Sequence, residues 1–144
     1  MSEVQNLHRW TLPRAESQAR AQLDTLTEWI KALDVAEEEG EAELEGETLD
    51  AEAIQDRIQE DPLSVRIRSD WHTPNGDANA GEYELLLCTG GPAVRIVGEL
   101  SEHHDPQTAQ IECQDWFAPW REMPTDSDEQ AVMVRYACPF YYGE

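Results

Sequence analysis

The sequence predicts a single α+β domain in which N-terminal helices and a C-terminal helix pack on a four-stranded antiparallel β-meander. Apolar residues recur at spacings of three and four in the first third of the chain, which is typical of an amphipathic helix. In the middle of the chain they alternate with polar residues, and short polar turns separate the alternating segments, as in consecutive antiparallel strands. A length of 144 residues with 40% hydrophobic residues suits one domain over residues 1–144.

The first predicted element is an amphipathic helix over residues 14–39. No proline interrupts this segment, and Gly40 is a suitable residue to end the helix. Its apolar face consists of Ala19, Leu23, Leu26, Ile30 and Leu33. We expect this face to cover the sheet, with the seam of a homodimer as the alternative.

An acidic segment follows the first helix. Between Asp34 and Asp61 the chain has 13 acidic residues and one base, Arg57, so this segment carries a charge of −12. Residues 37–48 have few apolar side chains to bury and repel one another strongly. We therefore expect residues 37–48 to be an acidic linker, either mobile or a frayed extension of the helix.

A short helix over residues 49–61 is predicted next, with Asp50 as its N-cap. The antiparallel sheet is expected over residues 63–115, in four strands with one apolar face. The residues assigned to the core side are Leu63, Val65 and Ile67, then Tyr83, Leu85 and Leu87, then Val94, Ile96 and Leu100, and finally Ala109, Ile111 and Cys113. The opposite face carries charges for which we expect cross-strand pairing. These are Arg66, Arg68, Glu84, Arg95 and Glu112.

Residues 116–144 are predicted to form an aromatic loop and a C-terminal helix. Asp126 with Glu129 three residues later has the pattern of a capping box, which favours a helix beginning there. Apolar residues in 126–138 also alternate, so a fifth strand is the alternative for that segment.

The net charge of −21, from 31 acidic and 10 basic residues, excludes several classes of partner. Direct binding to nucleic acid or to an anionic membrane requires clustered lysine and arginine, which this chain lacks. No apolar run reaches the length of a membrane-spanning helix. The start of the sequence lacks the pattern of a secretory leader, and three widely spaced cysteines do not form a disulfide framework. We therefore expect a cytoplasmic protein with reduced thiols.

No sequence pattern indicates catalysis, and we expect no catalytic residue, metal or cofactor. The histidines and cysteines lack the CxxC, HExxH and HxH spacings of metal sites. The alternative is a small enzyme or ligand-binding domain with a pocket near His72, His104 and Trp116. That alternative requires two titratable groups to converge in one concave site.

The charge distribution predicts a non-enzymatic, polyanionic interaction protein that binds a basic protein surface. Carboxylates four residues apart on a helix imitate a line of phosphates, so Glu37, Glu41 and Glu45 indicate a nucleic-acid mimic that targets a nucleic-acid-binding protein. Tryptophan is enriched at interface hot spots, which makes Trp116 and Trp120 candidate anchors. The acidic residues assigned to partner binding are Glu37, Glu38, Glu39, Glu41, Glu43, Glu45 and Glu47. A third possibility is that the charge serves only solubility in high salt, in which case acids would be spread over all surfaces.

Three stretches in the second half of the chain resemble a family of small acidic uncharacterised proteins of proteobacterial plasmids, integrative elements and prophages. These stretches are Tyr83–Ala93, Gln114–Trp120 and Tyr136–Glu144, and the likeness covers residues 63–144. No catalytic residue is carried over from that family. The resemblance implies a mobile genetic element, a context in which small acidic proteins disarm restriction or CRISPR systems, so an anti-defence factor is expected.

Overall fold

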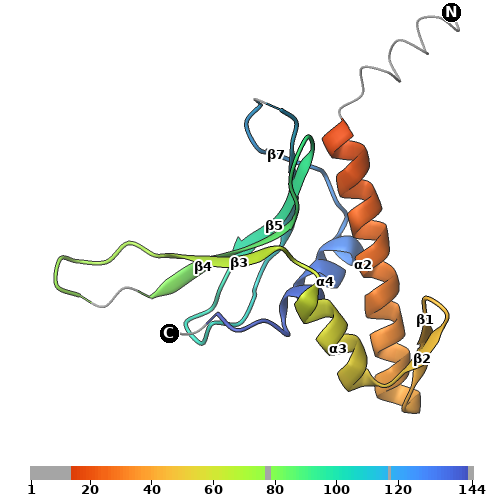
Figure 1. The fold of residues 1–144 in the computed structure, drawn as a ribbon. Coiled ribbons are helices and arrows are strands. Elements are labelled where there is room, and N and C mark those ends of the chain that lie inside the picture. The colour runs from red at the N-terminus through yellow and green to blue at the C-terminus, as the bar shows by residue number, and fades with distance from the viewer. Residues whose placement is uncertain (1–13, 77–78, 117, 143–144) are drawn as a thin grey trace, which may run out of the picture.

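Within the residues that the computed structural model describes (14–76, 79–116 and 118–142), three helices cover one face of a five-stranded antiparallel sheet (Figure 1). The strands follow one another in chain order across this sheet, and a separate two-stranded hairpin lies beside the helices. The helices are α2 (Arg14–Glu39), α3 (Ala51–Glu60) and α4 (Ser127–Ala137). The strands are β1 (Ala42–Leu44), β2 (Glu47–Leu49), β3 (Ser64–Ser69), β4 (Ala80–Cys88), β5 (Ala93–Glu99), β6 (Gln110–Gln114) and β7 (Arg121–Glu122).

Helix α2 has the bounds and the apolar face that the sequence predicts. Ala19, Leu23, Leu26, Ile30 and Leu33 are all buried in the core. Gly40 ends the helix with a φ of 97°, and its N–H donates to the carbonyl of Ala36 at 2.8 Å. Because this face packs on the sheet and on α4, it is not available as a dimer seam.

The expectation of an unstructured acidic linker over residues 37–48 is wrong. The helix continues to Glu39, and β1 and β2 then form a hairpin around Glu45 and Gly46. Both turn residues have positive φ, 51° and 83°, which is the geometry of a type I′ hairpin turn. Ala42 and Leu44 are buried while Glu43 between them is exposed, so two apolar residues anchor the hairpin to the core.

Helix α3 begins as predicted. Asp50 is its N-cap, and the side chain accepts from the N–H of Ala53 at 2.8 Å. Ile54 and Ile58 are fully buried against the core. The helix ends at Asp61, whose carboxylate accepts a hydrogen bond of 2.5 Å from the hydroxyl of Tyr136 in α4.

The main sheet has five strands, where four were predicted. The additional strand β7 is only two residues long, and Arg121 in it pairs with Cys113 of β6. A segment this short has no periodic pattern, so its sequence could not indicate a strand. The core-side residues expected for β4, β5 and β6 are buried, as are Leu100 and Ala109 beside them.

Strand β3 differs from the prediction because its apolar residues are not buried. Val65 pairs with Leu85, and Ile67 pairs with Tyr83, so both lie on the face of the sheet that the helices cover. Nevertheless Leu63, Val65 and Ile67 are 60%, 40% and 48% exposed. The helices stop short of this edge, and the β3–β4 hairpin projects from the body as an arm (Figure 1).

The segment 126–138 is a helix, so the alternative of a strand is wrong. Asp126 and Glu129 form the predicted capping box, with the side chain of each accepting from the backbone N–H of the other. Three ion pairs join α4 to α2: Arg20 binds Glu129, and Arg135 binds both Asp34 and Glu37.

The aromatic tail after α4 packs back on the sheet. The ring of Tyr142 lies 5.2 Å from the ring of Tyr83, and its hydroxyl donates to the carbonyl of Ala137 at 2.7 Å. Tyr141 is 79% exposed. Among the described residues, no helix has the length and apolar composition needed to cross a membrane.

Candidate protein-interaction surfaces

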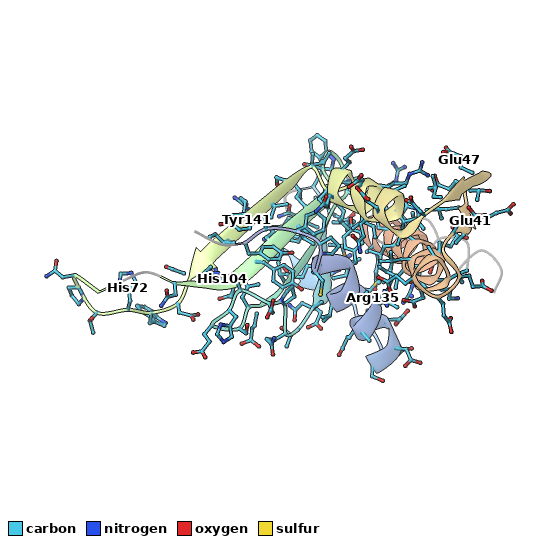
Figure 2. All side chains as sticks on the ribbon, turned by 90° about the horizontal axis from the view of Figure 1, so that it is seen from below. Glu41, Glu47, His72, His104, Arg135 and Tyr141 are labelled. Atoms are coloured by element: carbon cyan, nitrogen blue, oxygen red, sulfur yellow. The ribbon has the colours of Figure 1, made fainter. Side chains whose placement is uncertain are left out.

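The acidic segment folds into an ordered unit, which we call the acidic lobe (residues 34–61). It consists of the last turns of α2, the β1–β2 hairpin and α3, and these elements pack against one another. Glu41 and Glu47 project from this end of the molecule, and Arg135 lies at its border (Figure 2). The carboxylates are therefore presented on helices and a hairpin.

Three of the seven glutamates assigned to partner binding are engaged within the molecule. Glu45 accepts a hydrogen bond from the indole Nε1 of Trp29 at 3.0 Å and also contacts Arg57. Glu47 lies 3.4 Å from the same Arg57, and Glu37 binds Arg135 of α4. The contacts of Glu45 and Glu47 fasten the hairpin to α2 and α3, and the contact of Glu37 joins α2 to α4, so the three side chains have a structural role.

The other four glutamates are exposed and form no hydrogen bond or ion pair with any residue that the structure describes. They are Glu38, Glu39, Glu41 and Glu43. Glu38 and Glu39 are on the last turn of α2, whereas Glu41 and Glu43 are on the hairpin. The helical line that we expected through Glu37, Glu41 and Glu45 does not exist, because the helix ends at Glu39.

The alternation of acid and apolar residues from Glu41 to Glu45 is a period-two signal for a strand, and the Glu45-Gly46 step is a turn signal. Both signals are short and lie in a segment of very high charge, which by itself favours a linker. The burial of Ala42 and Leu44 explains why so acidic a hairpin folds.

The two tryptophans do not lie with the acidic residues. Asp115, next to Trp116, accepts from the N–H of Ala15 at the start of α2, while the acidic lobe lies at the end of that helix (Figure 1). A helix of 26 residues is about 39 Å long. The predicted acidic surface and the predicted aromatic anchors are therefore two separate places.

Trp116 and Trp120 also differ from each other in surroundings. Trp116 is 67% exposed, and its indole packs against the β4–β5 turn, where a Cβ on Gly91 would lie 2.7 Å from Nε1. Trp120 is half-buried, and the guanidinium of Arg95 stacks on its ring at 4.2 Å from the centroid. Trp120 thus covers part of the sheet face that none of the described helices covers.

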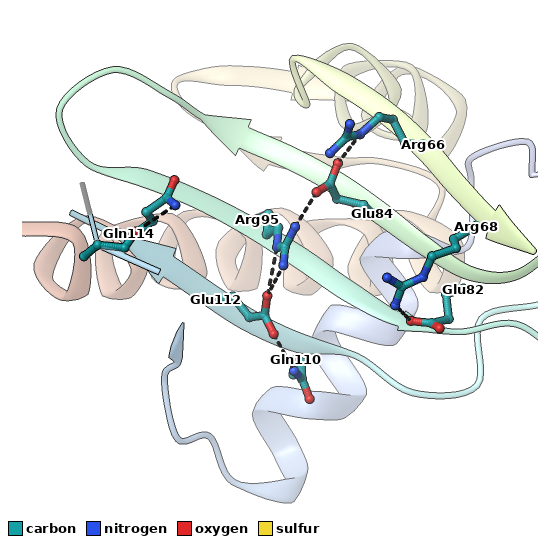
Figure 3. Close-up of polar contacts among 9 residues, drawn as sticks. Arg66, Arg68, Glu82, Glu84, Arg95, Gln110, Glu112 and Gln114 are labelled. Carbon is teal, nitrogen blue, oxygen red and sulfur yellow. Dashed lines mark hydrogen bonds and ion pairs between the residues drawn. The ribbon is translucent and has the colours of Figure 1, made fainter. Parts of the chain in front are cut away.

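That outer face carries the cross-strand charges that the sequence predicts. A ladder of four charged residues crosses β3 to β6 in the order Arg66, Glu84, Arg95 and Glu112 (Figure 3). Successive hydrogen bonds along it measure 2.6, 2.7 and 2.8 Å. Gln110 adds a bond of 2.7 Å to Glu112.

Glu84 is the centre of this ladder, and its side chain is only 11% exposed. The hydrogen bond from Arg66 and that from Arg95 lower the pKa of Glu84 against the opposing effect of burial. Two arginines and two glutamates cancel in charge, so the ladder is neutral. A depression of about 530 Å³ lies over it, but its charged groups already satisfy one another.

The pocket proposed near His72, His104 and Trp116 is not formed. His72 lies on the projecting arm, and His104 lies on a separate loop nearer the body (Figure 2). The depression that His72 lines is completed by Arg68, Asp70 and Glu82 among others, and contains neither His104 nor Trp116. No group of three or more His, Cys, Asp or Glu side chains in the described part of the chain is arranged to hold a metal ion.

Three comparisons with known proteins find no relative of this chain. No family model, no curated protein and no solved structure matches the chain.

Proposed function

We propose that this chain is a non-enzymatic binding protein whose acidic lobe engages a basic surface of a protein partner. The partner class that fits best is a nucleic-acid-binding protein, whose basic groove accepts a line of negative charges. On this proposal the chain acts in the cytoplasm and competes with nucleic acid, as an anti-defence factor of a mobile element would.

The observation that carries the proposal is that the acidic lobe is folded. A disordered acidic linker would lose conformational freedom on binding, which offsets much of the gain from contact. Glu38, Glu39, Glu41 and Glu43 are instead fixed to a helix end and a hairpin, and no described residue neutralises them. Their charge is therefore preorganised for a partner.

The uneven distribution of charge favours this proposal over a role in solubility alone. The acidic lobe carries −12 of the total −21 in 28 of 144 residues. A high-salt adaptation would spread acids over all surfaces, whereas a concentrated field steers a basic partner toward one end of the molecule. Trp116 offers a second contact only to a partner that spans the length of α2.

A retention experiment with two charge variants tests the proposal. The first variant replaces Glu38, Glu39, Glu41 and Glu43 by Gln. The matched control replaces four exposed acids outside the lobe by their amides, namely Glu99, Glu102, Asp105 and Asp128. Both variants lose four negative charges, so a difference between them reports position. Each protein is immobilised, exposed to a lysate of the source organism at low salt, and eluted by raised salt.

We expect the wild type and the control to retain the same basic proteins, and the lobe variant to lose at least nine-tenths of them. Duplex DNA added to the lysate should release a nucleic-acid-binding partner, because both ligands occupy one groove. Equal retention by all three baits, or retention that raised salt does not weaken, would contradict the proposal.

A further inference from the structure

Strand β3 is an edge of the main sheet, and the described helices leave its apolar side uncovered. It pairs with β4 only, so its outer backbone groups have no strand partner among the described residues. Leu63, Val65 and Ile67 form a row on one face that is 40–60% exposed. Just beyond the strand, Trp71 is fully exposed. A long apolar edge of this kind is a template for pairing with another strand.

The edge is also locally neutral in a strongly acidic molecule. Arg66 binds Glu84 and Arg68 binds Glu82, each at 2.6 Å, so both arginines of β3 are already paired with β4. Elsewhere the excess of acids repels a second copy, with a net charge of −21 per chain. Close approach of two copies therefore costs less at β3 than at the acidic lobe.

We propose that β3 is the interface with a second copy of this chain, through antiparallel pairing of the two β3 strands about a two-fold axis at Val65. This pairing satisfies the free backbone edges of both copies and joins their sheets. It places Val65 opposite Val65 and Leu63 opposite Ile67 of the second copy, so apolar side chains meet. A register centred on Arg66 would place two arginines directly opposite each other, which is unfavourable.

Self-complementarity supports a second copy over another strand, because the apolar residues of β3 are spaced symmetrically about Val65 and meet apolar residues of the second copy on the same face. In this register Arg66 of one copy lies opposite Ser64 of the other, and Arg68 lies opposite Pro62, so no arginine faces another. Arg66 and Arg68 are on the opposite face of the strand and keep their ion pairs with β4.

Measurement of molar mass in solution with two matched variants tests the proposal. Val65→Lys places two like charges on the two-fold axis. Val35→Lys is the control, because Val35 on α2 is also a valine and is also 40% exposed. By light scattering we expect the wild type and Val35→Lys to have twice the 16.4 kDa of the chain, and Val65→Lys to have the monomer mass. A monomeric wild type, or a Val65→Lys dimer, would overturn the proposal.

A cross-link provides a second test that does not depend on how Val65→Lys folds. Residues directly opposite in an antiparallel pair have Cβ atoms about 5 Å apart, within reach of a disulfide after slight adjustment. In a Cys138→Ser background, which removes the exposed native cysteine, Val65→Cys should form a dimer under oxidation and Val35→Cys should not. Absence of the Val65→Cys cross-link would also overturn the proposal.

This proposal is independent of the proposed function and has the opposite dependence on salt. Raised salt screens repulsion between two acidic copies and should tighten the dimer, whereas it weakens attraction between the acidic lobe and a basic partner. Each can therefore fail without the other.

Discussion

Glu84 illustrates how single residues stabilise the open face of the sheet. It lies on β4, between an arginine from each neighbouring strand, and Trp120 covers the second of these by stacking on Arg95. The alternation of residues along the strands predicted a charged face. Glu84 is the most enclosed carboxylate on this face because of the loop that carries Trp120. No periodic pattern in the sequence indicates where that loop lies.

We predict that Glu84→Gln lowers the free energy of unfolding by about 2 kcal/mol at neutral pH, because it leaves Arg95 without its charged partner on β4. The pKa of Glu84 is lowered in the folded state. The contribution of ionised Glu84 to the free energy of unfolding is therefore complete above the ordinary Glu pKa of about 4.3. It is lost as the pH falls through the lower pKa of the folded state. Urea unfolding at pH 7 and below pH 4 should show the difference between wild type and variant shrinking with acidification.

Glu82→Gln is the control for this prediction. Its partner Arg68 is 76% exposed in side chain, and an exposed ion pair contributes less than about 1 kcal/mol. If the two substitutions lowered the free energy of unfolding equally, the enclosure of Glu84 would not increase the strength of its ion pairs.

At the scale of elements, the starts of helices α3 and α4 differ from the β1–β2 hairpin in how far the sequence predicts them. The N-termini of α3 and α4 were both predicted, because Asp50 and Asp126 cap backbone N–H groups within three residues and need nothing from the rest of the fold. The β1–β2 hairpin was not predicted, because its strands are short and their stability depends on the packing of Ala42 and Leu44 into a core built by α2 and α3.

We predict that Asp126→Ala lowers the free energy of unfolding by about 1 kcal/mol, because the N–H of Glu129 loses its acceptor and the capping box is broken. Thermal unfolding followed by circular dichroism measures the loss. Asp128→Ala removes a charge from the same first turn without removing a cap, so it should cost clearly less. A larger loss for Asp128→Ala would mean that charge at the helix start, and not capping, stabilises α4.

At the scale of the whole molecule, charge and apolar coverage are both uneven. The acidic lobe concentrates −12 at one end, and the helices cover β4 to β6 but not β3. The two proposals place a basic partner at the acidic end and a second copy of the chain at the β3 edge. The neutral ladder keeps the remaining sheet face ordered without a helical layer.

We predict that added salt raises the free energy of unfolding from low ionic strength upward, because screening reduces repulsion among 31 acidic residues faced by only 10 bases. The variant with glutamine at 38, 39, 41 and 43 should show a clearly smaller rise than the variant altered at 99, 102, 105 and 128. Urea midpoints at low and moderate salt measure both. Equal rises would mean that the repulsion is spread evenly over the chain.

The sequence by itself determined the helices α2, α3 and α4, three of the strands with their buried faces, and the charged outer face, because periodicity, caps and turns are local properties of the chain. It also determined that charge is concentrated in residues 34–61. Only the tertiary structure decided which glutamates are paired, since Arg57 and Arg135 reach Glu45, Glu47 and Glu37 across elements. It also decided that β3 is uncovered, because the area that three helices cover on a sheet depends on how they pack together, and no single segment encodes that.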